Sequence, residues 1–314
     1  MRRRTLGRTS IEVTELALGT WGLCGDGYGP VPDAEQDGVI DRALGVGIRL
    51  FETADVYAQG EMERRLGARL AHEGSAVIVT KLGTRREGSL PRKDFSPEYL
   101  RSAIERSRER LDRDVIDVVL LHNPSPKAFQ DPKLAELLER LVSDGRARAW
   151  GASVGSVEAG RAAIQAGASV LELAYNVFHT AELRELEAEL VERNVGVLAR
   201  SVLSHGLLCG LWPPNKEFPT GDHRAERWNG DELKRRIQQL NAVRTLLTRD
   251  VPTLRAIALR FALASERVAA AVLGPRSALQ LDQLVREAGR TPPYIEPQRL
   301  DELRERLITV GVST

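Results

Sequence analysis

Short apolar runs alternate with segments of helical periodicity along almost the whole chain. Eight runs predict β-strands, at residues 16–18, 49–51, 77–80, 115–121, 148–152, 170–174, 196–200 and 270–273. Between the third run (77–80) and the fourth (115–121), apolar Leu100, Ala103 and Ile104 recur at helical spacing. Ser96 followed by Pro97 is typical of the start of that helix, which we expect over residues 98–111. Further helices are predicted at residues 181–193, 231–247, 252–265 and 278–288.

This alternation predicts an α/β fold built as a (β/α)₈ TIM barrel. Short strands that are buried on both faces and separated by helices form parallel sheets, and eight of them can close into a barrel. An open doubly wound sheet is the alternative. Residues 4–6 and 11–13 flank a turn-like segment and predict an N-terminal β-hairpin at the barrel floor. We also expect extra C-terminal helices and, without a Ser-, Gly- or Pro-rich linker, one domain over residues 1–314.

Two long stretches carry no periodic pattern. Residues 22–32 are rich in glycine, and residues 209–229 contain three prolines and further glycines. Long irregular loops in a compact domain are usually binding loops or lids. We therefore expect both stretches near a functional site.

Composition narrows the class of protein. The formal net charge is +1, which offers no basic field for nucleic acid. No apolar run approaches the roughly 20 residues that span a bilayer, and the N-terminal arginines precede no signal-peptide core. Two cysteines, Cys24 and Cys209, and five scattered histidines argue against a structural metal site. We expect a cytoplasmic protein without a nucleic-acid, membrane or metal partner. Only six of the 45 Lys and Arg residues are lysines, a bias typical of a GC-rich bacterial genome.

Three consecutive predicted strands deliver polar side chains to one rim. Glu52 and Tyr57 follow the second strand, Lys81 ends the third, and His122 ends the fourth. In a parallel barrel, catalytic residues sit at these carboxyl ends. Each residue alone is more often a structural or solvated group, but adjacent strands rarely carry all of them by chance.

The chemistry of this set is acid catalysis. A free tyrosine loses its proton near pH ~10, and a neighbouring ammonium is expected to lower that pKa. The carboxylate would keep the lysine charged and aimed, and a neutral imidazole would orient a substrate oxygen. The set predicts protonation of an oxygen that gains negative charge, such as a carbonyl that accepts a hydride.

Over nearly its whole length the sequence resembles the aldo-keto reductase superfamily. The phrases FETADVY, VIVTK and VVLLH, which end at Tyr57, Lys81 and His122, are similar to the family's catalytic phrases. Further similar phrases are ALGTWG, GASVGS, ELAYN, RSVLSHGLLCG, DHR and LGPRSALQLDQL. The resemblance implies an NADP(H)-dependent enzyme that reduces an aldehyde or ketone, sugar-like or a natural product, to an alcohol.

By the same resemblance, Tyr57 is the proton donor, Lys81 modulates it, and His122 orients the carbonyl. The carboxylate partner of Lys81 maps to Glu52, where the family has aspartate. Glutamate adds one methylene, and a misplacement of about 1 Å can cost of order 10²-fold in rate. Either the rim is adjusted to Glu52 or activity is reduced.

No G-x-G-x-x-G follows the first strand, which argues against a Rossmann dinucleotide site. The resemblance implies instead that NADP(H) binds on the rim of the barrel. Ser153 and Glu172 would lie at the nicotinamide carboxamide, with Arg200 stacked on its ring. Arg276 would pair with the 2′-phosphate, and Gln280 would lie against the adenine. The full set expected to contact the cofactor is Gly19, Thr20, Ser153, Glu172, Arg200, Ser201, Leu203, Gly206, Leu208, Gly274, Arg276 and Gln280.

Several expected contacts depart from the family pattern. Val154 and Glu172 stand where the family has asparagine and glutamine, and Leu284 replaces an adenine-binding asparagine. These departures indicate a divergent member, with subfamily drift, a specialised substrate or lost activity as the explanations. The tryptophans expected to line the substrate pocket are Trp21, Trp212 and Trp228.

Other functions stay open at this point. Gly151 to Gly155 matches G-x-S-x-G, but a hydrolase needs a histidine near the C-terminus and the last one here is His223. A catalytically weakened dinucleotide-binding subunit is the more serious alternative, and a lyase or isomerase on the same fold is the third. The sequence does not give the oligomeric state, the carbonyl compound or the direction of the reaction.

Overall fold

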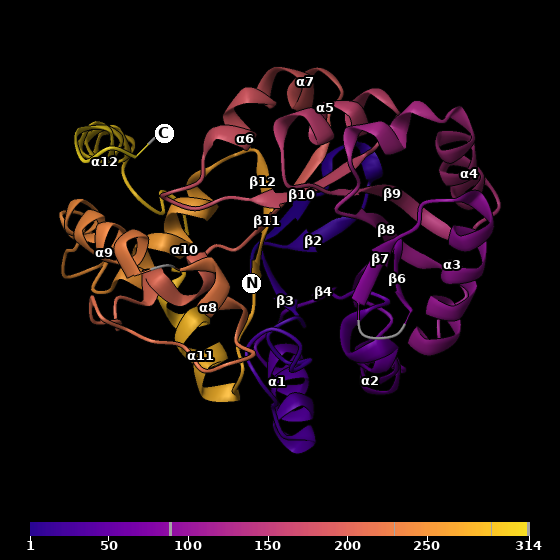
Figure 1. Ribbon diagram of the computed structural model, residues 1–314, viewed down its shortest axis with the longest axis horizontal. Coiled ribbons are helices and arrows are strands. Elements are labelled where there is room, and N and C mark those ends of the chain that lie inside the picture. Colours follow the sequence, from indigo (N-terminus) through magenta and orange to yellow (C-terminus); the bar gives the residue numbers. More distant parts are fainter. Residues whose placement is uncertain (88–89, 229, 290, 313–314) are drawn as a thin grey trace.

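The computed structural model describes residues 1–87, 90–228, 230–289 and 291–312. Eight parallel strands close into a barrel in the ring order β10-β11-β12-β3-β4-β5-β8-β9 (Figure 1). The barrel strands are β3 (Leu16–Gly19), β4 (Leu50–Glu52), β5 (Val77–Leu82), β8 (Ile116–His122), β9 (Ala147–Ser153), β10 (Val170–Ala174), β11 (Gly196–Arg200) and β12 (Val268–Leu273). The closed ring confirms the (β/α)₈ barrel and excludes the open sheet.

Helices surround the barrel and begin where the sequence supplies caps. The Ser96 hydroxyl accepts a hydrogen bond from the backbone N–H of Tyr99, which starts α3 as expected. The helices are α1 (Asp33–Gly45), α2 (Glu61–Leu70), α3 (Pro97–Leu111), α4 (Pro132–Ser143), α5 (Val157–Gln165), α6 (Ala181–Glu185), α7 (Glu187–Glu192), α8 (His223–Arg227), α9 (Gly230–Arg244), α10 (Leu254–Ala264), α11 (Ala278–Glu287) and α12 (Pro297–Thr309).

Apolar side chains form three cores. One fills the barrel interior and includes Leu50, Val79 and Leu120. The second lies between the strands and their helices. The third joins α9, α10 and α12, which gather on one side of the barrel (Figure 1). Those helices include the additional C-terminal elements that the sequence indicated.

The floor of the barrel is closed by the expected hairpin. Strands β1 (Arg3–Thr5) and β2 (Glu12–Thr14) pair antiparallel, and Leu6, Ile11 and Val13 join the interior core. The hairpin presses close to β11, because a Cβ added at Gly7 would lie 2.2 Å from the backbone nitrogen of Gly196. The interior is therefore packed from below and opens at the carboxyl ends of the strands.

Two elements near the rim were not expected from the sequence. Strands β6 (Thr84–Glu87) and β7 (Leu90–Lys93) form a hairpin directly after β5. The stretch expected as an irregular loop over residues 209–229 contains α8, and its last residue, 229, lies outside the described residues. Within the described part of the chain, no helix combines the length and apolar character that a membrane crossing needs.

Candidate active site

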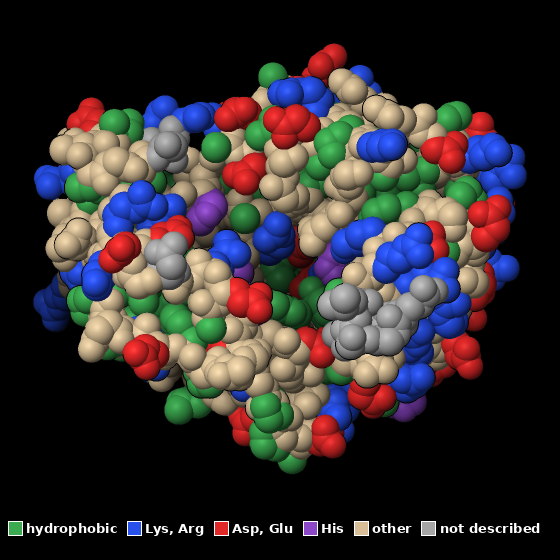
Figure 2. Space-filling view, in the orientation of Figure 1, with side chains coloured by type: hydrophobic (Ala, Val, Ile, Leu, Met, Phe, Trp, Pro, Cys, Tyr) green, Lys and Arg blue, Asp and Glu red, His purple; other side chains and the backbone are tan. Residues whose placement is uncertain are grey.

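Polar side chains form the uppermost layer of the barrel interior. Alternate residues of a strand face the same side. Leu50, Val79 and Leu120 face the barrel interior, so Glu52, Lys81 and His122, each two residues further along its strand, face it too. The same rule, applied to the other strands, gives the set Gly19, Glu52, Lys81, His122, Ser153, Glu172, Arg200 and Gly274. The mouth above this layer is hollowed, with basic and histidine side chains around it (Figure 2). The interior thus changes from apolar to ionisable at the end where barrel enzymes carry their sites.

The four residues expected to be catalytic lie together in this layer. Lys81 forms an ion pair with Glu52, and both side chains are buried. The Lys81 ammonium lies 4.9 Å from the centroid of the Tyr57 ring. The Tyr57 and His122 rings meet edge to face, with centroids 5.9 Å apart and an interplanar angle of 86°. A phenol, an ammonium, an imidazole and a carboxylate therefore converge on one place.

The end of β3 is shaped around Glu52. Gly19 pairs with Glu52 in the sheet, and a Cβ at Gly19 would lie 2.9 Å from the Glu52 carboxylate. The backbone N–H of Thr20 donates to the Glu52 carbonyl oxygen at 2.9 Å, and the Thr20 hydroxyl donates to the Thr53 hydroxyl at 2.9 Å. Thr20 is fully buried. Gly19 and Thr20, expected as cofactor contacts, thus hold Glu52 in place, and the absent Cβ at Gly19 leaves room for its longer side chain.

Left-handed backbone follows three of the site residues. Ala58 and Gln59 after Tyr57, Asn123 after His122, and Ser201 after Arg200 all have φ between 46° and 58°. Such conformations cost of order 1–3 kcal/mol at non-glycine residues and cluster at functional sites. The chain therefore turns sharply just after Tyr57, His122 and Arg200, and each turn leads the backbone out of the barrel mouth.

Burial sets the protonation states of the site. It raises the pKa of Tyr57 well above its ordinary value, and the Glu172 carboxylate raises it further. Burial also lowers the pKa of Lys81 to about 8, against the opposing effect of Glu172. The pKa of His122 is held well below its usual range by burial and by Lys81. At neutral pH the phenol is protonated and the imidazole is neutral.

The direction of the Tyr57 shift differs from the sequence-based expectation. A neighbouring ammonium was expected to lower the pKa of the phenol, whereas the structure raises it. The physical reason is that desolvation of the buried ring outweighs nearby positive charge, while Lys81 lies over the ring and is paired with Glu52. In this state Tyr57 can donate a proton and does not act as a base.

Glu172 enters the same layer from the opposite wall. Its carboxylate is buried and lies 3.9 Å from the Lys81 ammonium, and its Oε2 has no hydrogen-bond partner in the described parts of the chain. Ser153 pairs in register with both Glu172 and His122 and is also buried. The Arg200 guanidinium donates to the carbonyl oxygen of Val154 at 2.9 Å. These three residues adjoin the catalytic group, as the resemblance implied for the nicotinamide end of a cofactor.

The other end of the expected cofactor site also suits a dinucleotide. The Nη1 atom of Arg276 is buried without a hydrogen-bond partner among the described residues, and its Nη2 donates to the Pro30 carbonyl oxygen at 3.1 Å. No described carboxylate is ion-paired with Arg276, so the guanidinium can take a phosphate. Gly274 is exposed and open space surrounds it, so backbone and ligand can approach closely. The side chain of Gln280 accepts from the Arg276 backbone N–H at 2.9 Å, which fixes the helix start beside it.

The segment after β11 contains four residues that, by the resemblance, would line the pyrophosphate of the cofactor: Ser201, Leu203, Gly206 and Leu208. A 3₁₀ turn spans Ser204–Cys209. Leu208 is fully buried and its N–H donates to the Leu203 carbonyl oxygen, and the N–H of Gly206 donates to the same oxygen. These two residues therefore have no free backbone donor for a pyrophosphate. Ser201 and Leu203 are half-buried and lie at the start of this segment.

The three tryptophans have different environments. Trp228 is 7 % exposed and packs in the core formed with α9 and α10, so it presents little surface to a ligand, and its place in the substrate pocket stays a prediction. Trp212 packs edge-on against Phe218, with ring centroids 5.0 Å apart. Trp21 is half-buried and follows β3 directly, at the rim.

Trp21 belongs to an aromatic cluster that joins the two long loops. Its ring lies 4.9 Å from Tyr28 and 4.6 Å from His223, centroid to centroid. The Tyr28 hydroxyl lies 3.3 Å from Nδ1 of His205. The backbone N–H of His223 donates to the Gly27 carbonyl oxygen at 2.9 Å. Residues 22–32 are thereby attached to the segment after β11, beside Arg276.

Two supporting residues were missed from the sequence. The Lys93 ammonium, on β7, donates to the His122 carbonyl oxygen at 2.6 Å and to the Thr84 hydroxyl at 2.8 Å. Asn176 is buried and donates to the Ser201 carbonyl oxygen at 2.9 Å, which ties the ends of β10 and β11 together. The scarcity of lysine was a signal for Lys93, whereas nothing in the sequence singled out Asn176.

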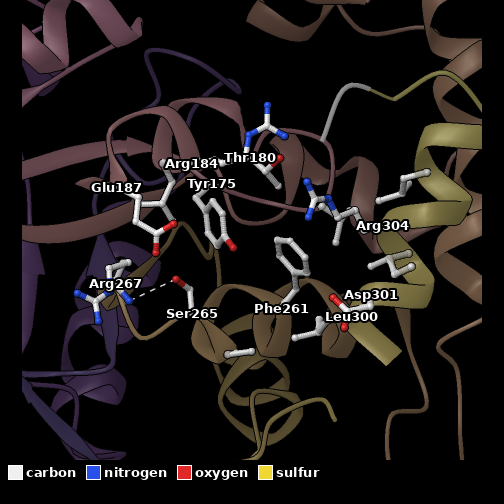
Figure 3. Close-up of a pocket in the computed structure, with 15 residues that line it drawn as sticks. Tyr175, Thr180, Arg184, Glu187, Phe261, Ser265, Arg267, Leu300, Asp301 and Arg304 are labelled. Atoms are coloured by element: carbon white, nitrogen blue, oxygen red, sulfur yellow. Dashed lines mark hydrogen bonds between the residues drawn. The ribbon is translucent and has the colours of Figure 1, made fainter. Parts of the chain in front are cut away.

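A separate cavity of about 300 Å³ lies between α6, α10 and α12 (Figure 3). The rings of Tyr175 and Phe261 stack in it, with centroids 5.3 Å apart. None of the converging catalytic side chains lines it. The chemistry described above therefore belongs to the barrel mouth and not to this cavity.

The aldo/keto reductase family profile matches residues 15–303, so this chain belongs to the aldo/keto reductase family and is an oxidoreductase. Glycerol dehydrogenase from Gluconobacter oxydans is similar in structure, with 26 % identity, a TM-score of 0.84, and coverage of 96 % of this chain and 94 % of that one. An aldo-keto reductase from Bacillus halodurans, in its holo form, has 24 % identity, a TM-score of 0.81 and coverage of 98 % and 96 %.

Proposed function

We propose that this protein reduces an aldehyde or ketone to an alcohol with NADPH. The observation that carries the proposal is the convergence of Tyr57, Lys81, His122 and Glu52 at the carboxyl ends of β4, β5 and β8. Tyr57 holds its proton at neutral pH, which a group that gives a proton to oxygen requires.

Each residue has one role in this proposal. When bound, the nicotinamide supplies the hydride that the carbonyl carbon accepts. Tyr57 donates its proton to the carbonyl oxygen, which gains negative charge as the hydride arrives. Neutral His122 donates a hydrogen bond to the same oxygen and fixes its orientation. Lys81, held by Glu52, stabilises the phenolate that Tyr57 becomes.

The preference for NADPH over NADH rests on Arg276. Its guanidinium has a buried, unpartnered nitrogen and no described carboxylate as a partner. Arginine presents a planar fork that suits a phosphate monoester. Substitution Arg276→Ala is expected to weaken NADPH binding at least tenfold and to change NADH binding little, measured by fluorescence titration. Equal losses for both dinucleotides would contradict a 2′-phosphate contact.

The substrate class is proposed to be a small polar carbonyl compound. The similar structure of a glycerol dehydrogenase favours aldehydes and ketones derived from short polyols. The polar layer at the bottom of the mouth suits hydroxyl-bearing substrates. On this proposal the partners of the protein are one dinucleotide and one small molecule.

A carbonyl panel tests the proposal. Purified protein is mixed with NADPH and with short hydroxyaldehydes, hydroxyketones, alkyl aldehydes and aromatic aldehydes, and NADPH consumption is followed. We expect turnover of at least one class, with hydroxylated compounds best. Tight NADPH binding without any turnover would instead support a dinucleotide-binding subunit, the candidate that the substitution of aspartate by Glu52 also favours.

A further inference from the structure

The barrel mouth contains one more carboxylate than the proposed mechanism uses. Glu52 reaches Lys81 from β4, and Glu172 reaches it from β10, which lies four strands away on the opposite wall of the eight-stranded ring. Both carboxylates are buried. A single ammonium thus stands between two carboxylates from opposite sides.

Glu172 is the less well compensated of the two. Its nearest cation is Lys81 at 3.9 Å, beyond hydrogen-bond distance, and its Oε2 has no hydrogen-bond partner among the described residues. A buried carboxylate without hydrogen bonds is costly unless something completes its environment. A ligand that brings positive charge to the mouth would do so.

The other groups around this layer reduce the imbalance without pairing with Glu172. His122 is neutral at physiological pH. Arg200 keeps its positive charge, but its guanidinium donates to the Val154 carbonyl oxygen and forms no ion pair with Glu172 in the described structure. Lys93 donates to the backbone carbonyl oxygen of His122, and Asp55 is a further buried acid in the loop after β4. The remaining neighbour, Tyr57, carries no charge while it holds its proton.

We propose that Glu172 makes this site prefer the oxidised dinucleotide over the reduced one. This inference rests on the proposed function. The nicotinamide ring carries a positive charge only in its oxidised form, so a buried carboxylate in the same layer attracts that form and is nearly indifferent to the other. Because Lys81 and Arg200 offset part of the field of Glu172, we expect a preference of only about tenfold from this one charge.

The preference supports carbonyl reduction. When the oxidised form binds more tightly, hydride loss from the bound reduced form becomes more favourable. A tenfold preference lowers the potential of the bound two-electron couple by about 30 mV. The expected drawback is slow release of, and inhibition by, the oxidised dinucleotide.

The test compares the affinities of NADP⁺ and NADPH for the purified protein and does not need turnover. Glu172→Gln removes the charge and keeps the shape. We expect the ratio of the Kd for NADPH to the Kd for NADP⁺ to fall about tenfold in this variant. Glu172→Asp, which keeps the charge, should stay close to the unmodified protein. Glu15→Gln is the matched control, since Glu15 is equally buried but lies at the barrel floor, and its ratio should not change.

Each result bears on the proposal. An unchanged ratio in Glu172→Gln, with both dinucleotides still bound, overturns the inference and leaves the proposed function standing. Failure of the unmodified protein to bind either dinucleotide overturns both. If Glu172→Gln does not fold, the neutral variant Glu172→Met takes its place, with the same fall expected. An equal fall of the Kd ratio in Glu15→Gln would show that the ratio responds to the loss of any buried carboxylate, and would also contradict a specific role for Glu172.

Discussion

Two buried glutamates at opposite ends of the barrel have contrasting surroundings. At the floor, Glu15 accepts a hydrogen bond from the Tyr294 hydroxyl at 2.5 Å and lies 3.7 Å from Arg4. Arg4 in turn donates to the carbonyl oxygens of Leu263, Ser265 and Val268. At the rim, Glu172 has one cation at 3.9 Å and an oxygen without any hydrogen bond in the described structure.

The contrast shows where the fold retains polar groups for function. At the floor the charges are bonded to fixed protein groups and hold the hairpin, β12 and the C-terminal segment together. At the rim, buried atoms lack partners in the described residues, among them Nδ1 of His122, Oε2 of Glu172 and Nη1 of Arg276, while at the floor Nε of Arg4 also lacks one. Since native proteins satisfy most buried polar atoms, the three rim atoms, which belong to an open mouth, indicate a place where a ligand can complete the hydrogen bonds.

Removal of the Tyr57 hydroxyl should have the largest effect. Loss of a general acid costs about 10²–10⁴-fold, so Tyr57→Phe should lower kcat by that amount. The affinity for NADPH should stay unchanged, because the ring and its packing remain. Steady-state kinetics with a titration of NADPH separate the two quantities. Undiminished turnover would show that Tyr57 is not the proton donor and that the reaction does not take place at this rim.

Shortening Glu52 tests whether the rim is fitted to glutamate. Glu52→Asp keeps the charge and retracts it by about 1 Å, a displacement that can cost of order 10²-fold. Because Gly19 leaves space for the longer side chain, we expect kcat to fall by about tenfold or more. A rise in kcat would show instead that glutamate is a compromise at this position.

Asp55 should make folding stability depend on pH. Burial, with the Glu63 carboxylate, raises the pKa of Asp55 to about 7 in the folded protein. The folded state therefore binds a proton that the unfolded chain loses near pH ~4, and this contribution is full below that pH and is lost as the pH rises toward 7. Relative to Asp55→Asn, the unmodified protein should lose on the order of 2 kcal/mol between pH 5 and 7. Urea unfolding measures the difference, and parallel pH profiles for the two proteins would contradict it.

The smallest effects are expected for the two contrasting glutamates. Glu15→Gln should destabilise the protein by about 1 kcal/mol, because Arg4 loses its carboxylate while Tyr294 can still donate. Glu172→Gln should leave stability unchanged or raise it slightly, since it removes an incompletely bonded buried charge. Thermal unfolding of the two variants compares them. A larger loss of stability in Glu172→Gln than in Glu15→Gln would contradict the view that Glu172 is the less well bonded of the two carboxylates.

Much of the architecture was accessible from periodicity. Alternating short strands and helices predict the barrel because burial on both faces requires parallel pairing, and the closed ring confirms it. The β6–β7 hairpin was missed because its segment, rich in Arg, has no apolar alternation. The burial of Trp228 could not be predicted, because a tryptophan in a loop resembles a ligand contact until its packing is known.

The site could be predicted only in part. Strand-end positions identify Lys81 and His122, since each directly follows an apolar run, and Tyr57 lies in the loop after the second predicted strand. Glu172 approaches Lys81 because the barrel closes and brings β10 opposite β4. The spacing of residues along the chain does not predict that these two side chains are close. The raised pKa of Tyr57 likewise follows from burial, which sequence patterns do not quantify.

On the proposed function, a hydride passes directly from a nicotinamide to a carbonyl carbon while Tyr57 protonates the oxygen. The most direct measurement uses NADPH deuterated at the reacting position of the ring, with mass spectrometry of the alcohol formed. The account predicts one deuterium, bound to the carbinol carbon, with formation of that labelled alcohol strongly reduced in Tyr57→Phe. An alcohol without deuterium, or labelled alcohol formed equally well by Tyr57→Phe, would contradict it.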